Sequence, residues 1–259
     1  MPTRPAAGPR LTAVVAAPEP IAPAAPPLPS RPLIRQRWRD VVFLHWRVEP
    51  TAVAPLLPPG TRPDTTPDGA TWVGLIPFRL EGSAFLGGPP VPWLGTFLET
   101  NVRLYAVDDA GRRSVVFRSL DAQHLLPVLA ARVAMGLPYR WARMRGERIG
   151  RTYRYASERL EGRTRPRTRI AAVRTDARVE EDPLADFLTA RWAMHVAHLG
   201  ATRYWRNEHE PWPLHRGELL ELEDELVADA GFPGLARRAP DSVLVSPGVG
   251  TRFAGPARL

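Results

Sequence analysis

The sequence predicts an α+β fold in which antiparallel strands dominate, and three observations indicate it. From residue 33 onward, short segments rich in β-branched and aromatic side chains follow one another, separated by turns that contain glycine and proline. Helical segments are inserted between these strands without a regular strand–helix alternation, which favours α+β over α/β. The chain also shows no internal repeat, so a solenoid or propeller is not expected.

Each predicted element rests on a local pattern. Strands are expected at 41–48, 71–79, 96–107, 114–121, 140–160, 168–179, 204–205 and 242–245, with the turn Asp108–Gly111 joining two of them as a hairpin. Helices are expected at 123–135, with Pro127 in the first turn, and at 183–199, where apolar residues repeat at helical spacing up to Leu199. The segment 219–227 fits either a strand or a helix.

The first 32 residues differ in composition from the rest of the chain. They hold 10 of the 30 prolines and one short apolar stretch at 11–17. We expect residues 1–32 to form a disordered alanine- and proline-rich tail, with a secretory signal as the alternative. A single folded domain is then expected over residues 33–259. No apolar run approaches the roughly 18 residues that span a bilayer, so we expect no membrane partner and a cytoplasmic location.

Two residue types are missing, and their absence excludes several chemistries. All 35 basic residues are arginine, and the chain contains no lysine and no cysteine. A Schiff base on a side-chain amine, a pyridoxal-phosphate anchor and a lysine-type phosphate loop are therefore excluded. Thiol nucleophiles, disulfides, iron–sulfur clusters and thiolate zinc sites are excluded as well. Carboxylate, imidazole, hydroxyl and guanidinium chemistry remains, and we expect no cofactor and no metal.

The net charge of +8 is concentrated in one segment, the stretch Arg140–Arg178, which has 13 arginines and four acids. Tyr153 and Tyr155 alternate with arginines there, so the segment has the composition of a face that binds phosphates and stacks bases. The preferred interpretation is the solvent-facing side of an antiparallel meander, because no known nucleic-acid-binding motif is present. We therefore expect no nucleic-acid partner, and keep an acidic protein or nucleic acid on this face as the alternative.

The strand 96–107 carries the most informative pattern. Phe97, Glu99, Asn101, Arg103 and Tyr105 share one face, whereas the other face is apolar. The polar face is either the wall of a polar cavity or a surface ladder of ion pairs between neighbouring strands. In a cavity, Arg103 would orient an anionic ligand and Glu99 would supply an acid–base group, with Asp121 of the next strand as a weaker candidate.

Histidines give the remaining candidates. One of His45 and Trp46 must face inward on the first strand. His195 and His198 lie three residues apart on the predicted helix, and His209 and His215 flank a Trp–Pro segment next to two glutamates. Either pair would suit a metal-dependent hydrolase, a third alternative, although a buried structural role is the simpler interpretation.

Eight blocks, in order along the chain, resemble the bacterial YqjF-like family, a domain of unknown function (DUF2071) grouped with the acetoacetate decarboxylase-like fold. The blocks are FLHW, LLPPG, WVGLIPF, ETNVRLY, SLDA, LPY, FLTARW and HEPWPL, and they span roughly residues 37–245. The resemblance implies a mostly antiparallel, β-barrel-like domain with an enclosed cavity for a small molecule. It also implies that the ETNVR strand faces this cavity.

The resemblance does not carry the chemistry of the fold over to this chain. True acetoacetate decarboxylases form an imine on a lysine, and arginine cannot replace it because it stays protonated. We expect a protein that binds a small organic anion, a carboxylate or polyketide-like molecule. Arg103, Asn101, Tyr105, His45 and Trp72 would form the ligand-binding wall, and Glu99 would act as a general acid or base in a lyase- or isomerase-type reaction.

Overall fold

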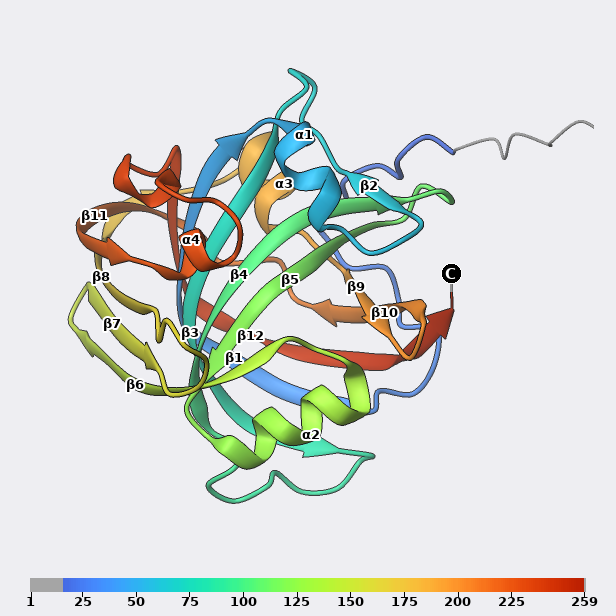
Figure 1. Ribbon diagram of the computed structural model, residues 1–259, viewed down its shortest axis with the longest axis horizontal. Coiled ribbons are helices and arrows are strands. Elements are labelled where there is room, and N and C mark those ends of the chain that lie inside the picture. Colours follow the sequence, from blue (N-terminus) through green and yellow to red (C-terminus); the bar gives the residue numbers. More distant parts are fainter. Residues whose placement is uncertain (1–15, 259) are drawn as a thin grey trace, which may run out of the picture.

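The structure is a computed structural model that describes residues 16–258 (Figure 1). Its strands are β1 (Ile34–Val48), β2 (Thr61–Pro63), β3 (Thr71–Phe85), β4 (Phe97–Asp108), β5 (Arg113–Ala122), β6 (Tyr139–Ile149), β7 (Thr152–Arg159), β8 (Arg167–Arg178), β9 (Ala193–His198), β10 (Ala201–His209), β11 (His215–Asp224) and β12 (Ser242–Arg258). Its helices are α1 (Pro50–Val53), α2 (Leu125–Met135), α3 (Pro183–Thr189) and α4 (Leu226–Asp229), with 3-10 turns at Ala54–Leu56 and Leu235–Arg237. None of these helices is both long and apolar enough to cross a bilayer.

All the strands belong to one sheet, which closes on itself twice. Its order is β10-β9-β5-β6-β7-β8-β11-β12-β1-β3-β4-β2, with additional pairings of β10 with β12 and of β5 with β4. The first ring is therefore β4-β5-β9-β10-β12-β1-β3, and the second ring is β4-β5-β6-β7-β8-β11-β12-β1-β3. Figure 1 shows β9 and β10 on one side of the shared strands and β6, β7, β8 and β11 on the other. Only β5 makes parallel pairs, with β6 and β9, so the expected mostly antiparallel, barrel-like α+β fold is confirmed.

Strand β4, which both rings share, is buried on both faces, because every one of its residues is buried. Leu98, Val102 and Leu104 pack into the core of the second ring, with Trp46, Tyr153 and Ile170 from other strands. The alternate residues of β4 face the first ring instead. The polar face predicted for this strand is thus directed to the inside of the protein.

Two elements differ from the sequence-based expectation. The predicted helix at 183–199 ends at Thr189, and residues 193–198 form β9 instead. Residues 187–196 are buried without interruption, and a run buried at every position fits helical and strand spacing alike. The last strand is also longer than the predicted 242–245, because β12 continues to Arg258 through two prolines and three glycines.

Part of the predicted N-terminal tail lies outside the described residues. The residues outside the description are 1–15, and they include most of the apolar stretch 11–17 that was considered as a signal. Residues 16–32 contain no helix or strand but lie against the domain. Trp192 Nε1 donates to the Ala22 carbonyl at 2.8 Å, and the carboxylate of Glu19 accepts from the Arg113 amide at 3.0 Å.

A glycine in β12 permits close packing at the wall that the two rings share. Gly248 has φ +116°, and a Cβ there would lie 1.9 Å from the Trp38 carbonyl oxygen. We expect Gly248→Ala to lower the free energy of unfolding by about 2 kcal/mol or more, through strain and displacement of β1. Gly250→Ala is the matched control, since a Cβ there meets no atom within 4 Å. Equal losses for the two variants in urea denaturation would contradict this packing.

Candidate functional site

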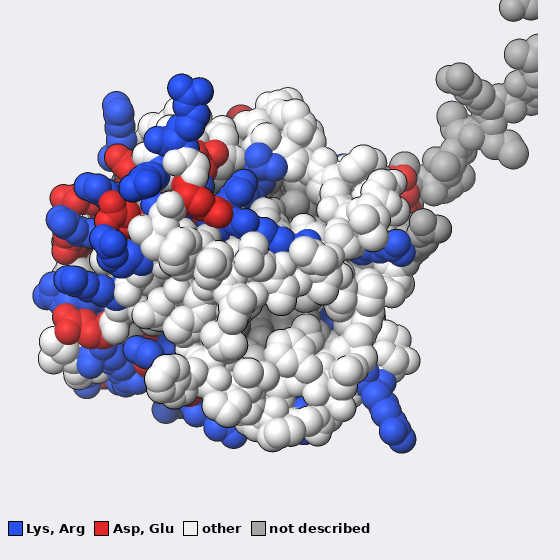
Figure 2. Space-filling view, turned by 60° about the horizontal axis from the view of Figure 1, so that its bottom comes forward, with Lys and Arg blue, Asp and Glu red and all other residues white. Residues whose placement is uncertain are grey.

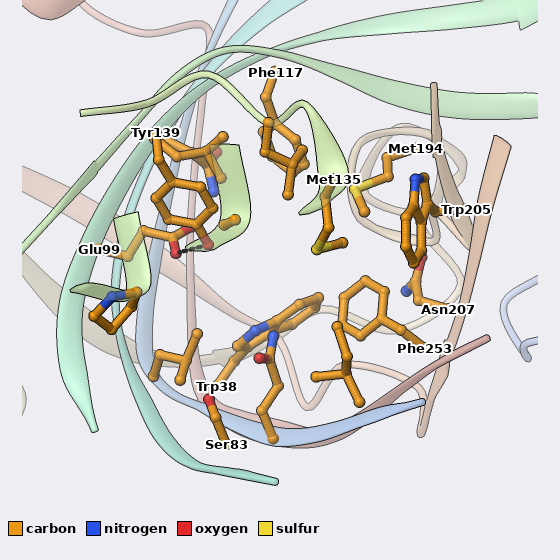
Figure 3. Close-up of a pocket in the computed structure, with 18 of the residues that line it drawn as sticks. Trp38, Ser83, Glu99, Phe117, Met135, Tyr139, Met194, Trp205, Asn207 and Phe253 are labelled. Atoms are coloured by element: carbon orange, nitrogen blue, oxygen red, sulfur yellow. Dashed lines mark hydrogen bonds between the residues drawn. The ribbon is translucent and has the colours of Figure 1, made fainter. Parts of the chain in front are cut away.

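The first ring encloses a cavity of about 560 Å³, within the usual range for small-molecule sites. Most of its wall is apolar, and Figure 3 shows aromatic and methionine side chains around it. The lining residues that are exposed to solvent come from α2, from the loop between β3 and β4 and from the end of β3 at Phe85, so the cavity opens between α2 and this loop. Figure 2 shows this opening as a hollow among uncharged residues. The polar lining residues are Gln36, Ser83, Glu99, Asn101, Arg103, Tyr139, Thr189, Arg191, Asn207 and His209.

Strand β4 supplies four lining residues in order of depth. Phe97 is nearest the opening, where its ring contacts His124 at the start of α2. Glu99 and Asn101 follow, and Arg103 is at the other end, where its Nη2 donates to the Leu188 carbonyl of α3 at 2.7 Å. The alternation of a strand therefore places a carboxylate, an amide and a guanidinium in one row along the cavity.

Arg103 is buried without a carboxylate partner. Its Nε donates to the Tyr105 hydroxyl at 3.2 Å, and no carboxylate among the described residues forms an ion pair with it. The nearby Asp64 is shared by two other guanidinium groups, those of Arg113 and Arg191. Arg103 and Arg191 both lie against the Tyr105 ring, at 5.5 and 4.8 Å. At this end of the cavity, Arg191 is thus balanced by a carboxylate behind the wall, whereas Arg103 is balanced by none of the described residues.

Tyr105 and His45 lie directly behind Arg103. The Tyr105 hydroxyl donates to the Leu188 carbonyl at 2.9 Å and lies 2.7 Å from His45 Nε2. Both side chains are fully buried, and neither lines the cavity. Burial lowers the pKa of His45 well below its ordinary value, with Arg103 and Arg191 adding to the effect. These two residues hold Arg103 in place rather than facing the cavity.

Glu99 is a cavity carboxyl with an unusual pKa. It is 3% exposed, and its Oε2 accepts a hydrogen bond from the Tyr139 hydroxyl at 2.8 Å, which Figure 3 shows. Burial raises the pKa of Glu99 from 4.5 to about 7, while hydrogen bonds from Tyr139 and Asn101 oppose this shift. Both protonation states are then populated near neutral pH, as a proton-transfer group requires.

The structure places Asp121 and Trp72 outside the cavity. A β-bulge at Arg118 inserts one residue into β5 opposite β4, so Ser119 and Asp121 face the second ring while Phe117 faces the cavity. Asp121 accepts hydrogen bonds from Arg159 at 2.7 and 3.2 Å there. Trp72 packs in the core cluster with Tyr105 and Phe187. Residue alternation could not reveal the bulge, which reverses the direction of these side chains.

Three cavity residues, Tyr139, Arg191 and His209, were not assigned to an anion site from the sequence. His209 is packed between Trp192 and Trp212, at 4.5 and 4.9 Å between ring centroids, and its Nδ1 lies 2.7 Å from the Glu210 carbonyl. This contact fixes the tautomer with a proton on Nδ1, which leaves Nε2 as an acceptor. Burial lowers the pKa of His209 to about 4, so its ring is neutral at pH 7. These residues come from distant parts of the chain and carry no local signal.

The histidine pairs considered for a metal do not converge. His195 is on β9, where its Nδ1 lies 2.5 Å from the Ser114 hydroxyl and its Nε2 3.3 Å from Asp108. His198, three residues on along a strand, points to the other side. His215 lies beside Arg174, away from the cavity that His209 lines. Over residues 16–258, no group of three potential ligands is close enough to hold an ion.

The arginine-rich segment forms β6, β7 and β8 of the second ring. Many of its arginines form ion pairs with nearby acids. Arg167 pairs with Glu158 at 2.9 Å, and Arg151 pairs with Asp176 at 2.7 Å. Arg169 faces Glu223 of the acidic strand β11 at 3.4 Å. Figure 2 shows the two signs of charge interspersed on this side of the molecule. The arrangement is that of a solvated outer face with weak ion pairs.

The raised pKa of Glu99 predicts a pH-dependent stability. Because this carboxyl binds a proton on folding between pH 4.5 and about 7, its contribution is favourable at low pH and is lost as the pH rises through this window. The free energy of unfolding of the native protein should fall by about 3 kcal/mol relative to Glu99→Gln between pH 4 and 8. Urea denaturation of both proteins across this range measures the difference, and a constant difference would contradict the prediction.

Comparison with known proteins agrees with this fold. Residues 35–250 match the family model DUF2071, described as an uncharacterized conserved protein. The uncharacterized protein YqjF of Bacillus subtilis is 32% identical over 199 residues, which cover 76% of this chain and 81% of that protein.

Similar solved structures share the architecture at low identity. An acetoacetate decarboxylase-like enzyme of Sphingomonas wittichii has a TM-score of 0.62 at 15% identity, covering 89% of this chain and 94% of its own. The enduracididine biosynthesis enzyme MppR has a TM-score of 0.58 at 18% identity, covering 88% and 90%. These structures establish an acetoacetate decarboxylase-like fold. With the family model matching most of its length, the chain belongs to the DUF2071 family.

Proposed function

We propose that the cavity of the first ring binds a small organic anion, with the ligand's carboxylate on Arg103. The supporting observation is the buried guanidinium of Arg103, which faces the cavity and has no carboxylate partner among the described residues. A buried charge without a counter-charge is costly, and a ligand carboxylate would remove that cost. The shared Asp64 is already engaged by two arginines, so it leaves this role to a ligand.

The polar groups around Arg103 suit an oriented organic acid. Asn101 Oδ1 is buried and has no hydrogen-bond partner within residues 16–258, so it is available to a ligand hydroxyl or amide. His209 adds an acceptor nitrogen on another wall. Among the structural neighbours, MppR has been solved with pyruvate and with a condensation product of pyruvate, which supports an organic acid in a cavity of this fold.

Glu99 is the proposed acid–base group of this site. As a carboxylate it would take the proton from a carbon next to a ligand carbonyl; the C–H electron pair becomes the C=C bond of an enolate, and the carbonyl oxygen takes the negative charge. Protonated Glu99 then returns the proton. Return to the same carbon restores the ketone, whereas return to a conjugated carbon moves the double bond and is an isomerisation. A pKa of about 7 suits both directions of transfer. Because the chain has no lysine, no imine on a side-chain amine takes part.

Removing the Arg103 charge should weaken anion binding. We expect Arg103→Gln to weaken the binding of hexanoate by about ten- to hundredfold, the usual value of a charged hydrogen bond. Arg103→Lys is the matched variant, since it keeps the charge but loses the paired donors. Calorimetry with hexanoate and with neutral hexanamide measures the effect. Equal affinity of hexanoate for the native protein and Arg103→Gln would contradict the proposed role, and so would an absence of hexanoate binding to either protein.

Removing the Glu99 carboxylate should stop proton transfer but preserve binding. We expect native protein to accelerate hydrogen–deuterium exchange next to the ketone of an oxo acid in D2O, followed by proton NMR. Glu99→Gln should lower this rate by about a hundredfold or more while hexanoate affinity changes little. A panel of oxo acids that differ in the position of the ketone is the substrate set. Equal exchange by both proteins would exclude Glu99 as the acid–base group.

A further inference from the structure

The positions of Arg103 and Glu99 set a length for the ligand. The two residues are four apart on one extended strand, so their Cα atoms are separated by about 13 Å. The Arg103 side chain also turns away from Glu99, because its Nε and Nη2 bond to Tyr105 and Leu188 at the closed end. A ligand whose carboxylate binds Arg103 therefore meets Glu99 at an atom many bonds away. A two- or three-carbon keto acid is too short to reach both groups.

The wall around this row is apolar. Its apolar residues include Trp38, Phe43, Ile76, Phe117, Met135, Met194 and Phe253. Figure 3 shows Trp38, Phe117, Met135 and Phe253 around the space between Glu99 and Trp205. Apolar walls of this kind gain free energy from covering an apolar ligand body and gain nothing from a second charge. The charged lining residues are Glu99, Arg103 and Arg191, and none of them lies at the opening.

The opening continues this apolar surface out to solvent. Of the eleven large apolar side chains exposed over residues 16–257, seven belong to α2 or to the loop between β3 and β4, and an eighth is Phe85 at the end of β3. Leu86 is 80% exposed and Leu126 62% exposed, and both line the mouth of the cavity. Exposed apolar groups concentrated at one site mark a place where an apolar ligand or surface binds.

We propose that the ligand is an elongated, amphipathic monocarboxylate. Its carboxylate binds Arg103 at the closed end, its reactive carbonyl lies midway beside Glu99, and its apolar end reaches the mouth between α2 and the loop between β3 and β4. This inference rests on the proposed anion site and adds the length, the polarity and the direction of the ligand. It distinguishes the site from one made for a short keto acid.

A chain-length series tests the proposal on the native full-length protein. Binding of butyrate, hexanoate, octanoate and dodecanoate is measured by calorimetry at pH 7. The affinity should rise by up to about fourfold for each methylene that becomes buried, and should stop rising when the chain passes the mouth. Dodecanol, which has the same chain without the charge, should bind far more weakly than dodecanoate.

Blocking the mouth provides the matched variants. Ala131 of α2 lines the cavity, so Ala131→Trp should remove the gain of dodecanoate over butyrate and leave butyrate binding unchanged. Val133 is on the same helix, 78% exposed and not a lining residue, so Val133→Trp should leave the whole series unchanged. An Ala131→Trp variant that gives the native series would overturn the proposed path through the mouth.

The outcomes separate this proposal from the function on which it rests. Equal affinity for butyrate and dodecanoate, both lost in Arg103→Gln, would keep the anion site and overturn the elongated ligand. Chain-length dependence that persists in Arg103→Gln would overturn the carboxylate anchor at the closed end. Hydrogen–deuterium exchange tests where the ligand's ketone lies. An oxodecanoate with its ketone far from the carboxylate should exchange its hydrogens next to the ketone faster than acetoacetate does. The reverse order would overturn the placement of the ketone beside Glu99.

Discussion

The burial of both faces of β4 is the constraint on which the rest of the structure depends. Because this strand belongs to two closed rings at once, neither of its faces meets solvent. One face is apolar and fills the core of the second ring, whereas the other carries Glu99, Asn101 and Arg103 into the first ring. Polar groups at such positions are stable only if they are satisfied within the protein or by a ligand. The cavity and its chemistry follow from that requirement.

The two rings satisfy their buried arginines differently. In the second ring, Arg159 is paired with Asp121 at 2.7 Å and with Asp229 at 2.5 Å, so its charge is balanced and the interior there is closed core. In the first ring, Arg103 has only a backbone carbonyl and a phenol as acceptors. A buried guanidinium with carboxylates on both sides is part of the architecture. The guanidinium of Arg103 faces a cavity without a carboxylate partner among the described residues, and it is there that we propose the ligand binds.

The shared fold explains the structural neighbours without extending their chemistry to this chain. A similar fold occurs in acetoacetate decarboxylase-like enzymes at 11–18% identity, a level that shows a common architecture and carries no argument about the site. Here the cavity carries a carboxyl and guanidinium groups and, as the chain has no lysine, no side-chain amine, and its exposed apolar mouth leads to solvent. The basic strands β6 to β8 form the outer wall of the other ring, where acids on adjacent strands offset much of their charge.

The sequence by itself determined the family, the α+β class, the excluded chemistries and the polar row on β4, because composition and strand alternation are local properties. It did not determine that 193–198 is a strand, since the continuously buried run 187–196 fits both spacings. The bulge that turns Asp121 away from Glu99 was equally hidden, because a one-residue insertion against a partner strand exists only in the pairing. Only the tertiary structure brought Tyr139, Arg191 and His209 to the cavity. Ring closure joins strands that are distant in sequence, and no local pattern records which strands will meet.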